Sequence, residues 1–154
     1  MKIQLLAVGQ KMPKWVQTGY GEYSKRLPPH LRLQLIDIRP GNRRKGADSA
    51  MREEAQALLA RRASGDRLIA LDEKGKQWST RKLAENLQNW MLGGQPVSLA
   101  IGGPDGHHDD VRTQAETLWS LGPLTLPHPV VRVVLAEQIY RAWTILEGHP
   151  YHRS

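Results

Sequence analysis

The sequence lacks cysteine altogether, since none occurs among its 154 residues. This absence excludes disulfide bonds, thiolate zinc sites and cysteine nucleophiles, and a reducing cytoplasmic environment fits best. Long apolar runs are missing as well, because no stretch approaches the ~20 residues of a membrane span. The apolar run at residues 2–8 has neither the length nor the cleavage site of a signal peptide. We therefore expect a soluble protein that begins with a β-strand and has no contact with membranes.

Acidic residues are in short supply: 15 Asp and Glu stand against 22 Lys and Arg, which gives a formal net charge of +7. Such an excess favours a polyanionic partner, because binding to a phosphate backbone releases counterions. A solvated positive face without any partner has the same composition. Charge alone therefore leaves both interpretations open.

What the chain does have is a regular alternation of strand and helix patterns, without internal repeats or low-complexity linkers. We expect strands at residues 2–8, 31–38, 67–71 and 97–101, and helices at 13–26, 48–63, 79–91, 109–119 and 130–146. This order predicts an α/β fold, with a mostly parallel sheet covered by helices on both faces, in a single domain of residues 1–154. Ligands of such sheets bind beyond the carboxyl ends of the strands. The loops after Leu71, Ile101 and Leu121 are therefore the candidate ligand loops.

Three glycines, Gly102, Gly103 and Gly106, lie within five residues directly after the strand at 97–101. Glycine lets the backbone approach a ligand closely and offer N–H donors. A tight turn that needs positive φ explains the same residues equally well. The spacing fits neither a Walker loop nor a GxGxxG fingerprint.

The segment at residues 120–129 contains three prolines and one glycine around Leu124-Thr125-Leu126. Proline pushes the preceding residue toward extended geometry, so the segment should be stiff. Leucine side chains beside free main-chain donors and acceptors suit an adenine ring. An ordinary edge strand is the alternative.

Polar residues that can cap a helix precede three of the expected helices: Asp48 or Ser49, Ser79 or Thr80, and Asp109 or Asp110. The last pair belongs to the run His107-His108-Asp109-Asp110, which invites a metal interpretation. We expect no metal there, because adjacent side chains point in different directions and no third cluster completes a site.

The helix expected at residues 130–146 is apolar nearly all round, which predicts burial and, in so small a protein, a subunit interface. Glu137 and Arg141 are four residues apart and are expected to pair. Arg132 lies in the first turn, where the helix dipole disfavours a cation, so an anionic partner is expected.

The segment after this helix groups Tyr151, His152 and Arg153. An aromatic ring, an imidazole and a guanidinium can stack on a base, exchange a proton and hold a phosphate. A frayed chain end is the alternative interpretation of such a tail.

Five segments, in order along the whole chain, resemble the ribosomal RNA large subunit methyltransferase H family of the SPOUT superfamily of knotted methyltransferases. They are Lys-Met-Pro-Lys-Trp-Val at residues 11–16, Ile-Gly-Gly-Pro-Asp-Gly at 101–106, Leu-Thr-Leu-Pro-His-Pro at 124–129, Tyr-Arg-Ala-Trp at 140–143 and His-Pro-Tyr-His-Arg at 149–153. The pair His107-His108 departs from the apolar or hydroxyl residues expected there.

The resemblance implies an α/β sheet with a carboxyl-terminal trefoil knot, a homodimer, and S-adenosylmethionine as methyl donor. The implied substrate is N3 of a pseudouridine in 23S ribosomal RNA, in a hairpin loop of the assembled ribosome. The implied cofactor contacts are Leu71, Gly103, Leu121, Gly122, Pro123, Leu124, Thr125 and Leu126.

For such a reaction the chemistry requires positioning of N3 and help in removing its proton. His152 is the candidate proton acceptor, Arg141 and Arg153 are candidates for holding phosphate or stabilising the anion, and Tyr151 is a candidate for stacking on the base. A helix of about 17 residues spans roughly 25 Å, so we expect the tail to act on the partner subunit's cofactor site. Two alternatives stay open: a non-catalytic ribosome-binding or assembly factor, and a nucleotide-binding domain acting on metabolites.

Overall fold

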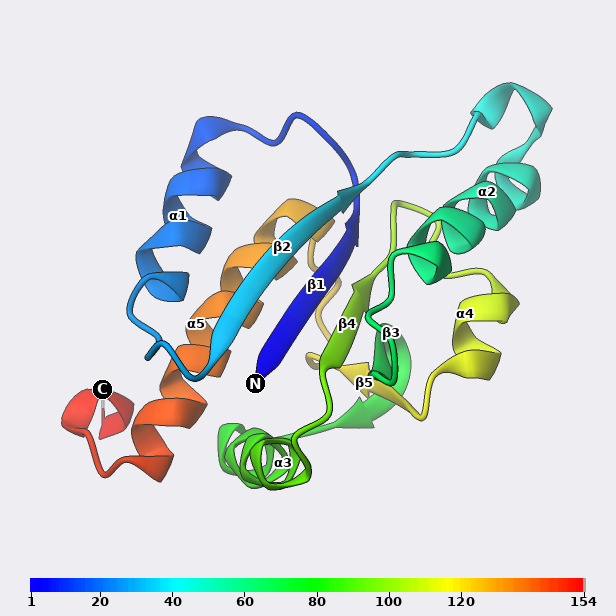
Figure 1. Cartoon of the computed structure of the whole chain (residues 1–154). Coiled ribbons are helices and arrows are strands. Elements are labelled where there is room, and N and C mark those ends of the chain that lie inside the picture. Colours follow the sequence, from blue (N-terminus) through cyan, green and yellow to red (C-terminus); the bar gives the residue numbers. More distant parts are fainter. Residues whose placement is uncertain (154) are drawn as a thin grey trace.

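A computed structural model describes residues 1–153 as a parallel five-stranded sheet with helices on both faces (Figure 1). The strands are β1 (Lys2–Val8), β2 (Arg32–Ile38), β3 (Arg67–Gln77), β4 (Val97–Ile101) and β5 (Thr117–Ser120), in the spatial order β2-β1-β4-β3-β5. The helices are α1 (Lys14–Ser24), α2 (Ala47–Ala60), α3 (Thr80–Gly93), α4 (Asp109–Gln114) and α5 (His128–Leu146), with short 3-10 turns η1 (Arg43–Lys45) and η2 (Pro150–Arg153). The predicted α/β fold class, a parallel sheet with helices on both faces, is confirmed.

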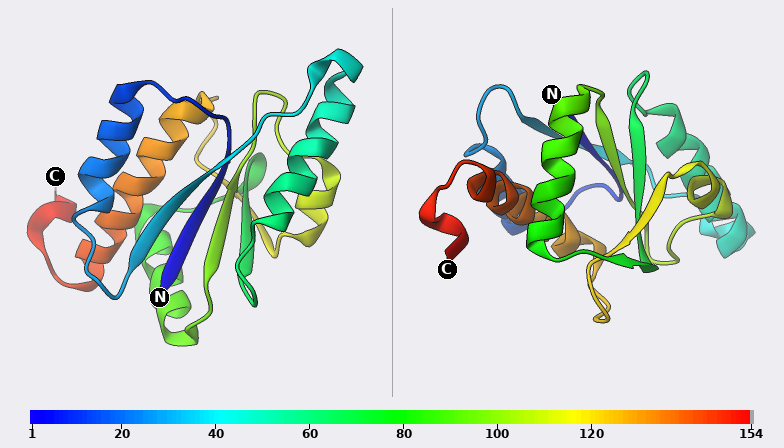
Figure 2. Two further views of the ribbon diagram at one scale, coloured as in Figure 1. Left: turned by 45° about the horizontal axis from the view of Figure 1, so that its top comes forward. Right: turned by 90° about the horizontal axis from the view of Figure 1, so that it is seen from below.

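Side chains of the central strand β1 alternate between the two faces of the sheet, as strand geometry requires. Ile3, Leu5 and Ala7 belong to one core with residues of α3 and α5, to which α1 is packed. Leu6 and Val8 belong to a second core with residues of α2 and α4. The two views in Figure 2 show these layers on opposite faces of the sheet. Because every strand pair is parallel, all five carboxyl ends lie along one edge.

Strand β3 is longer than expected and contains a bulge where a polar loop was predicted. Leu71 and Lys76 both pair with Trp119, so residues 72–75 stand out from the ladder. Gly75 returns the chain to the sheet, since a Cβ there would lie 2.5 Å from the backbone of Leu118. The prediction of a strand ending at Leu71 was therefore wrong in length, although its polar residues do leave the ladder.

The helix predicted at 109–119 is wrong in its second half, because α4 ends at Gln114 and Thr117–Ser120 is strand β5. The backbone of β5 pairs with that of β3, beginning with Thr117 opposite Ile69. The indole of Trp119 stacks on that of Trp78 with ring centroids 4.6 Å apart. Pairing with a distant strand thus overrode the local helical pattern.

Only one of the expected helix caps is present. The Ser79 hydroxyl accepts a hydrogen bond from the Lys82 N–H at the start of α3, as predicted. Helix α2 begins at Ala47 after Gly46, with no side-chain cap, so the prediction of Asp48 or Ser49 was wrong. At α4 the cap is Nδ1 of His108, which accepts from Asp110 N–H, and the two aspartates lie in the first turn instead.

Helix α5 has no exposed residue, which confirms the predicted burial. Both pairings expected on it are present: Arg141 Nε lies 2.9 Å from Glu137 Oε1, and Arg132 Nη1 lies 2.6 Å from Asp37 Oδ1. Arg132 is 1% exposed and also donates to the carbonyl of Gly9, so it links α5 to the ends of β1 and β2. Much of the cover comes from α1, α3 and η2 of the same chain. The apolar surface of α5 therefore does not by itself require a second subunit.

Candidate active site

A cavity of about 520 Å³ lies at the carboxyl edge of the sheet, beside the start of α5. The loops that follow Leu71, Ile101 and Leu121 converge on it, as the sheet topology predicted. Ligand pockets of proteins commonly measure about 300–1,000 Å³. The expected cofactor residues that line it are Leu71, Gly103, Leu121, Gly122, Leu124, Thr125 and Leu126; Pro123 is not among the lining residues.

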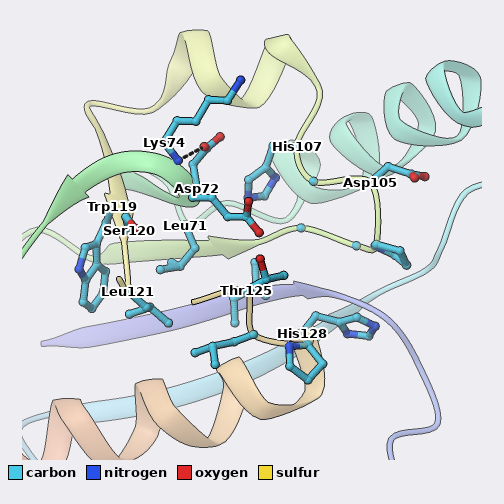
Figure 3. A pocket seen from close by; sticks show the side chains of 18 of the residues that line it. Leu71, Asp72, Lys74, Asp105, His107, Trp119, Ser120, Leu121, Thr125 and His128 are labelled. Atoms are coloured by element: carbon cyan, nitrogen blue, oxygen red, sulfur yellow. Dashed lines mark hydrogen bonds between the residues drawn. The ribbon is translucent and has the colours of Figure 1, made fainter. Parts of the chain in front are cut away.

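Apolar side chains form the inner wall of the cavity, while backbone forms part of its rim. Leu71, Leu121 and Leu126 are partly buried and pack against the main core. Figure 3 shows Leu71, Leu121 and Thr125 around the same space. The segment Leu124–Leu126 is irregular chain with no strand pairing, so the alternative of an edge strand is wrong.

The glycines at 102, 103 and 106 serve both purposes that the sequence suggested. Gly106 has φ +81° and its N–H bonds to the carbonyl of Gly103, which makes a tight turn. All three also line the cavity. A Cβ on Gly103 would lie 3.1 Å from Val8 and 3.4 Å from Glu54. A side chain at 103 would therefore crowd Val8 and Glu54. Because such a substitution strains the fold, it cannot test ligand binding in the cavity alone.

A charged pair that sequence reasoning missed lies on the cavity wall. Arg112 Nε is 2.9 Å from Asp72 Oδ2, and the Asp72 side chain is only 6% exposed. The Lys74 N–H donates to the other Asp72 oxygen at 2.8 Å and so orients the carboxylate. The bulge of β3 places these residues there. The only signal in the sequence was the polar run after the strand at 67–71.

The imidazole of His107 is buried on the same side of the cavity. Its Nε2 lies 3.1 Å from the carbonyl oxygen of Ala100, so the Nε2–H tautomer donates to that oxygen. Burial lowers the pKa of His107 below its ordinary value near 6.5, although the bond to Ala100 and the charge of Asp72 act in the opposite direction. As a neutral ring packed in the wall, His107 fills a position at which the resemblance implies an apolar or hydroxyl residue.

His128, the first residue of α5, lies on the opposite side of the cavity, as Figure 3 shows. Burial lowers its pKa, and the positive charge of Arg132 acts in the same direction. Its Nδ1 and the Nε1 of Trp119 are buried without a hydrogen-bond partner among the described residues. Buried polar atoms are normally paired, so two residues of this wall hold unused hydrogen-bonding capacity.

The tail residues do not meet the cavity within this chain. Residues 150–153 form the ordered turn η2 rather than a frayed end, and they pack on the carboxyl-terminal part of α5. The Tyr151 ring contacts Tyr140 edge-on at 4.7 Å, and the Arg141 guanidinium lies 4.9 Å from its centroid. The cavity lies at the other end of α5, whose 19 residues span roughly 28 Å. Figure 1 shows η2 beyond the end of α5, opposite the start of that helix.

The backbone contact that His152 of η2 makes determines the tautomer of its uncharged ring. Its Nδ1 contacts the carbonyl oxygen of His149. Because a carbonyl oxygen only accepts, the proton of the neutral ring must be on Nδ1, which leaves the lone pair on Nε2. The ring is partly exposed, so that nitrogen is within reach of a ligand.

The described residues contain no group of three metal-ligating side chains, and His107 and His108 are each engaged separately, by Ala100 and by the start of α4. None of the helices in the described part of the chain has the length and hydropathy to cross a membrane. A parallel sheet whose carboxyl edge carries a glycine-lined, partly apolar cavity is the architecture of nucleotide-binding and cofactor-binding α/β proteins.

Comparison with known families narrows this class: a family described as "Predicted SPOUT methyltransferase" matches residues 1–152. The chain belongs to the SPOUT methyltransferase family and is therefore an enzyme that uses a methyl donor. A relative from Hahella chejuensis is 54% identical over 156 residues, covering 100% of both chains. Relatives from Pseudomonas putida and Azotobacter vinelandii are 50% and 48% identical over 155 residues, covering 99% of this chain and 100% of theirs. All three are named ribosomal RNA large subunit methyltransferase H.

Proposed function

We propose that this protein methylates N3 of a pseudouridine in 23S ribosomal RNA of the assembled ribosome, with S-adenosylmethionine as donor, in the cytoplasm. The observation that carries the proposal is the convergence of the glycine loop, Leu71 and the 121–126 segment on one cavity. The full-length similarity to relatives named for ribosomal RNA methylation supports the choice of substrate. The trefoil knot, typical of SPOUT proteins, stays a prediction for this chain.

The cavity fits S-adenosylmethionine in size and in chemistry. Leu71, Leu121 and Leu126 offer an apolar slot for the adenine ring, and the backbone around Gly103 offers polar groups for its edge. Asp72 and Arg112 line the wall as an ion pair, which provides polar groups without adding net charge. When bound, this donor supplies a methyl group on a positively charged sulfur, so the protein needs no nucleophile of its own.

The acceptor nitrogen must give up its proton, and the tail carries groups suited to this task. His152 Nε2 holds a free lone pair that can receive the N3 proton. The Glu137 carboxylate raises the pKa of Arg141, so that guanidinium stays charged and can stabilise the anion formed on the base. We assign Arg153 to a phosphate and Tyr151 to the face of the base.

Cofactor binding in the cavity and proton removal by the tail together require a homodimer. The cavity and the tail lie at opposite ends of α5, so one chain cannot bring them to the same nucleotide. We propose that the tail of each subunit completes the site on its partner.

A methyl-transfer assay tests the proposal. Ribosomes that lack the modification are incubated with the protein and radiolabelled S-adenosylmethionine, and the 23S RNA is then digested to nucleosides for mass spectrometry. We expect one methyl group per ribosome, on N3 of a pseudouridine. Cofactor binding without any transfer to ribosomes would favour a different substrate, and the absence of both would favour a non-catalytic ribosome-binding factor.

A further inference from the structure

Residues 39–45, which connect β2 to α2 and are termed here the basic loop, expose four cationic side chains: Arg39, Arg43, Arg44 and Lys45. Arg43 is paired, since its Nη2 lies 2.7 Å from Asp105 Oδ2. Arg39, Arg44 and Lys45 form no ion pair with the described residues. Neither the cavity nor the tail uses these three cations.

The basic loop has a defined conformation, and nearby carboxylates are used to hold its backbone. Gly41 N–H donates to Glu54 Oε2 at 3.0 Å, and Asn42 N–H donates to Glu53 Oε2 at 3.1 Å. The Asn42 side chain in turn accepts from the Arg44 N–H at 3.0 Å. Because Glu53 and Glu54 accept hydrogen bonds from the loop backbone, they do not pair with the side chains of Arg44 and Lys45. The guanidinium of Arg44 and the ammonium of Lys45 therefore remain available to a ligand.

Contact with α2 also limits movement of the basic loop. A Cβ on Gly41 would lie 2.2 Å from the carbonyl oxygen of Ala50, so the loop backbone is packed directly on the helix. A cationic segment held in place in this way loses little conformational entropy when it binds a partner.

The basic loop borders the mouth of the cavity. Asp105, the partner of Arg43, belongs to the glycine loop that lines the cavity. In Figure 1 the loop extends past the same edge of the sheet at which the strands end, beside the start of α2. A nucleotide whose base enters the cavity can therefore place a flanking phosphate near this loop.

Resting on the proposed function, we propose that Arg44 and Lys45, with Arg39, bind phosphates of the ribosomal RNA strand that flank the target nucleotide. Guanidinium and ammonium groups bind phosphate through charge-assisted hydrogen bonds, and release of counterions makes such contacts dependent on salt. Phosphate contacts position a nucleic acid without reading its sequence. The basic loop thus orients the substrate, whereas the cavity and the tail act on the base.

The test is the double variant Arg44→Glu/Lys45→Glu, compared with Arg61→Glu/Arg81→Glu. The control changes two exposed arginines, Arg61 at the C-cap of α2 and Arg81 on α3, by the same total charge. Neither of them lines the cavity or forms an ion pair with the described residues. Affinity for protein-free 23S RNA, affinity for unmodified ribosomes, transfer to those ribosomes and cofactor affinity are measured at several salt concentrations. We expect the loop variant to lose at least ~10-fold in RNA affinity, with a salt slope reduced by about 1–2. Cofactor affinity should stay unchanged in both variants, and the control should keep its RNA affinity within about twofold.

Three outcomes would overturn the proposal. Equal losses in both variants would show general electrostatic attraction rather than a located contact. Unchanged affinity for protein-free RNA, with weaker binding to ribosomes, would point to a ribosomal protein as the partner of the loop. Wild-type transfer activity retained in full by the loop variant would exclude any role in substrate binding. The proposed function fails separately, when the wild-type protein itself transfers no methyl group to ribosomes.

Discussion

At the scale of single residues, the buried imidazole of His107 makes the stability of the fold depend on pH. Its ring is 5% exposed and its Nε2 bonds to the Ala100 carbonyl inside the sheet. Burial favours the neutral form and lowers the pKa. In the unfolded chain the pKa returns to its ordinary value near 6.5, so the unfolded state takes up a proton first as the pH falls.

We therefore expect the protein to lose stability as the pH falls below about 6.5, down to the lower pKa of the folded state. His107→Leu should reduce this loss, because leucine fills the buried site without a titratable group. Urea unfolding at about pH 7.5 and about pH 5.5 measures the change in both proteins. His128 contributes in the same direction and remains in the variant, so the loss should shrink rather than vanish. An unaltered loss in the variant would contradict the assignment.

Thr125 offers the sharpest residue-scale test of the cavity. Its side chain is exposed and borders the cavity, so a larger residue can fill that space without disturbing the core. We expect Thr125→Trp to weaken S-adenosylmethionine binding by roughly 10-fold or more, as calorimetry would show. Thr113→Trp, an exposed threonine on α4 that does not line the cavity, is the matched control and should bind as the wild type does. Equal affinity in all three proteins would place the cofactor elsewhere.

At the scale of elements, Arg132 joins α5 to the strands that precede the active-site edge. It bonds to Asp37 at the end of β2 and to the carbonyl of Gly9 after β1. Asp37 is 48% exposed whereas Arg132 is 1% exposed, so solvent screens one partner far more than the other. Removing the aspartate leaves a buried cation with only carbonyl partners.

A double-mutant cycle measures this link. We expect Asp37→Ala to lower the free energy of unfolding by about 1–3 kcal/mol, because the charge of Arg132 then loses its carboxylate. In the Arg132→Met background the same change should cost little, since no buried charge remains. Strictly additive losses in urea unfolding would show that the two side chains do not stabilise each other.

At the scale of the whole molecule, α5 separates the proposed cofactor cavity from the proposed catalytic tail. His128 at its start borders the cavity, and Tyr151 packs beyond its end on Tyr140. Parallel strands bring their carboxyl ends together and α5 then leads the chain away from that edge. In the proposed mechanism the tail of one copy therefore acts on a base held in the cavity of a second copy.

We first expect light scattering at micromolar concentration to give about twice the chain mass of 17.4 kDa. Within that dimer, complementation decides which cavity each tail serves. At cofactor concentrations well below the Kd of the Thr125→Trp chain, homodimers of that chain and homodimers of a chain cut before Tyr151 should each transfer little methyl. Their heterodimer should recover up to about half of the wild-type transfer, because one intact cavity then faces one intact tail.

The converse pairing is a useful control. A heterodimer of one wild-type chain and one chain carrying both changes should be inactive, since each site then lacks a cavity or a tail. Activity in this heterodimer, and none in the complementing one, would show that each tail serves its own cavity.

The sequence by itself determined much of this protein, through patterns that act over a few residues. Short apolar runs predicted β1 and β4, and alternating apolar residues predicted β2. These patterns sufficed to place the candidate ligand loops at one edge of the sheet. Local chemistry also predicted a cap at Ser79 or Thr80 and an anionic partner for Arg132, because unpaired backbone N–H groups and the helix dipole act at every helix start.

Only the tertiary structure decided the features that depend on residues distant in sequence. Thr117–Ser120 is a strand because β3 offers it hydrogen bonds, and the bulge after Leu71 puts Asp72 on the cavity wall. His107 became part of that wall by burial. The distance between tail and cavity follows from the direction of α5 in the fold. Local propensities contribute only tenths of a kcal/mol per residue (roughly 0–0.7), so pairing and burial against distant segments override them.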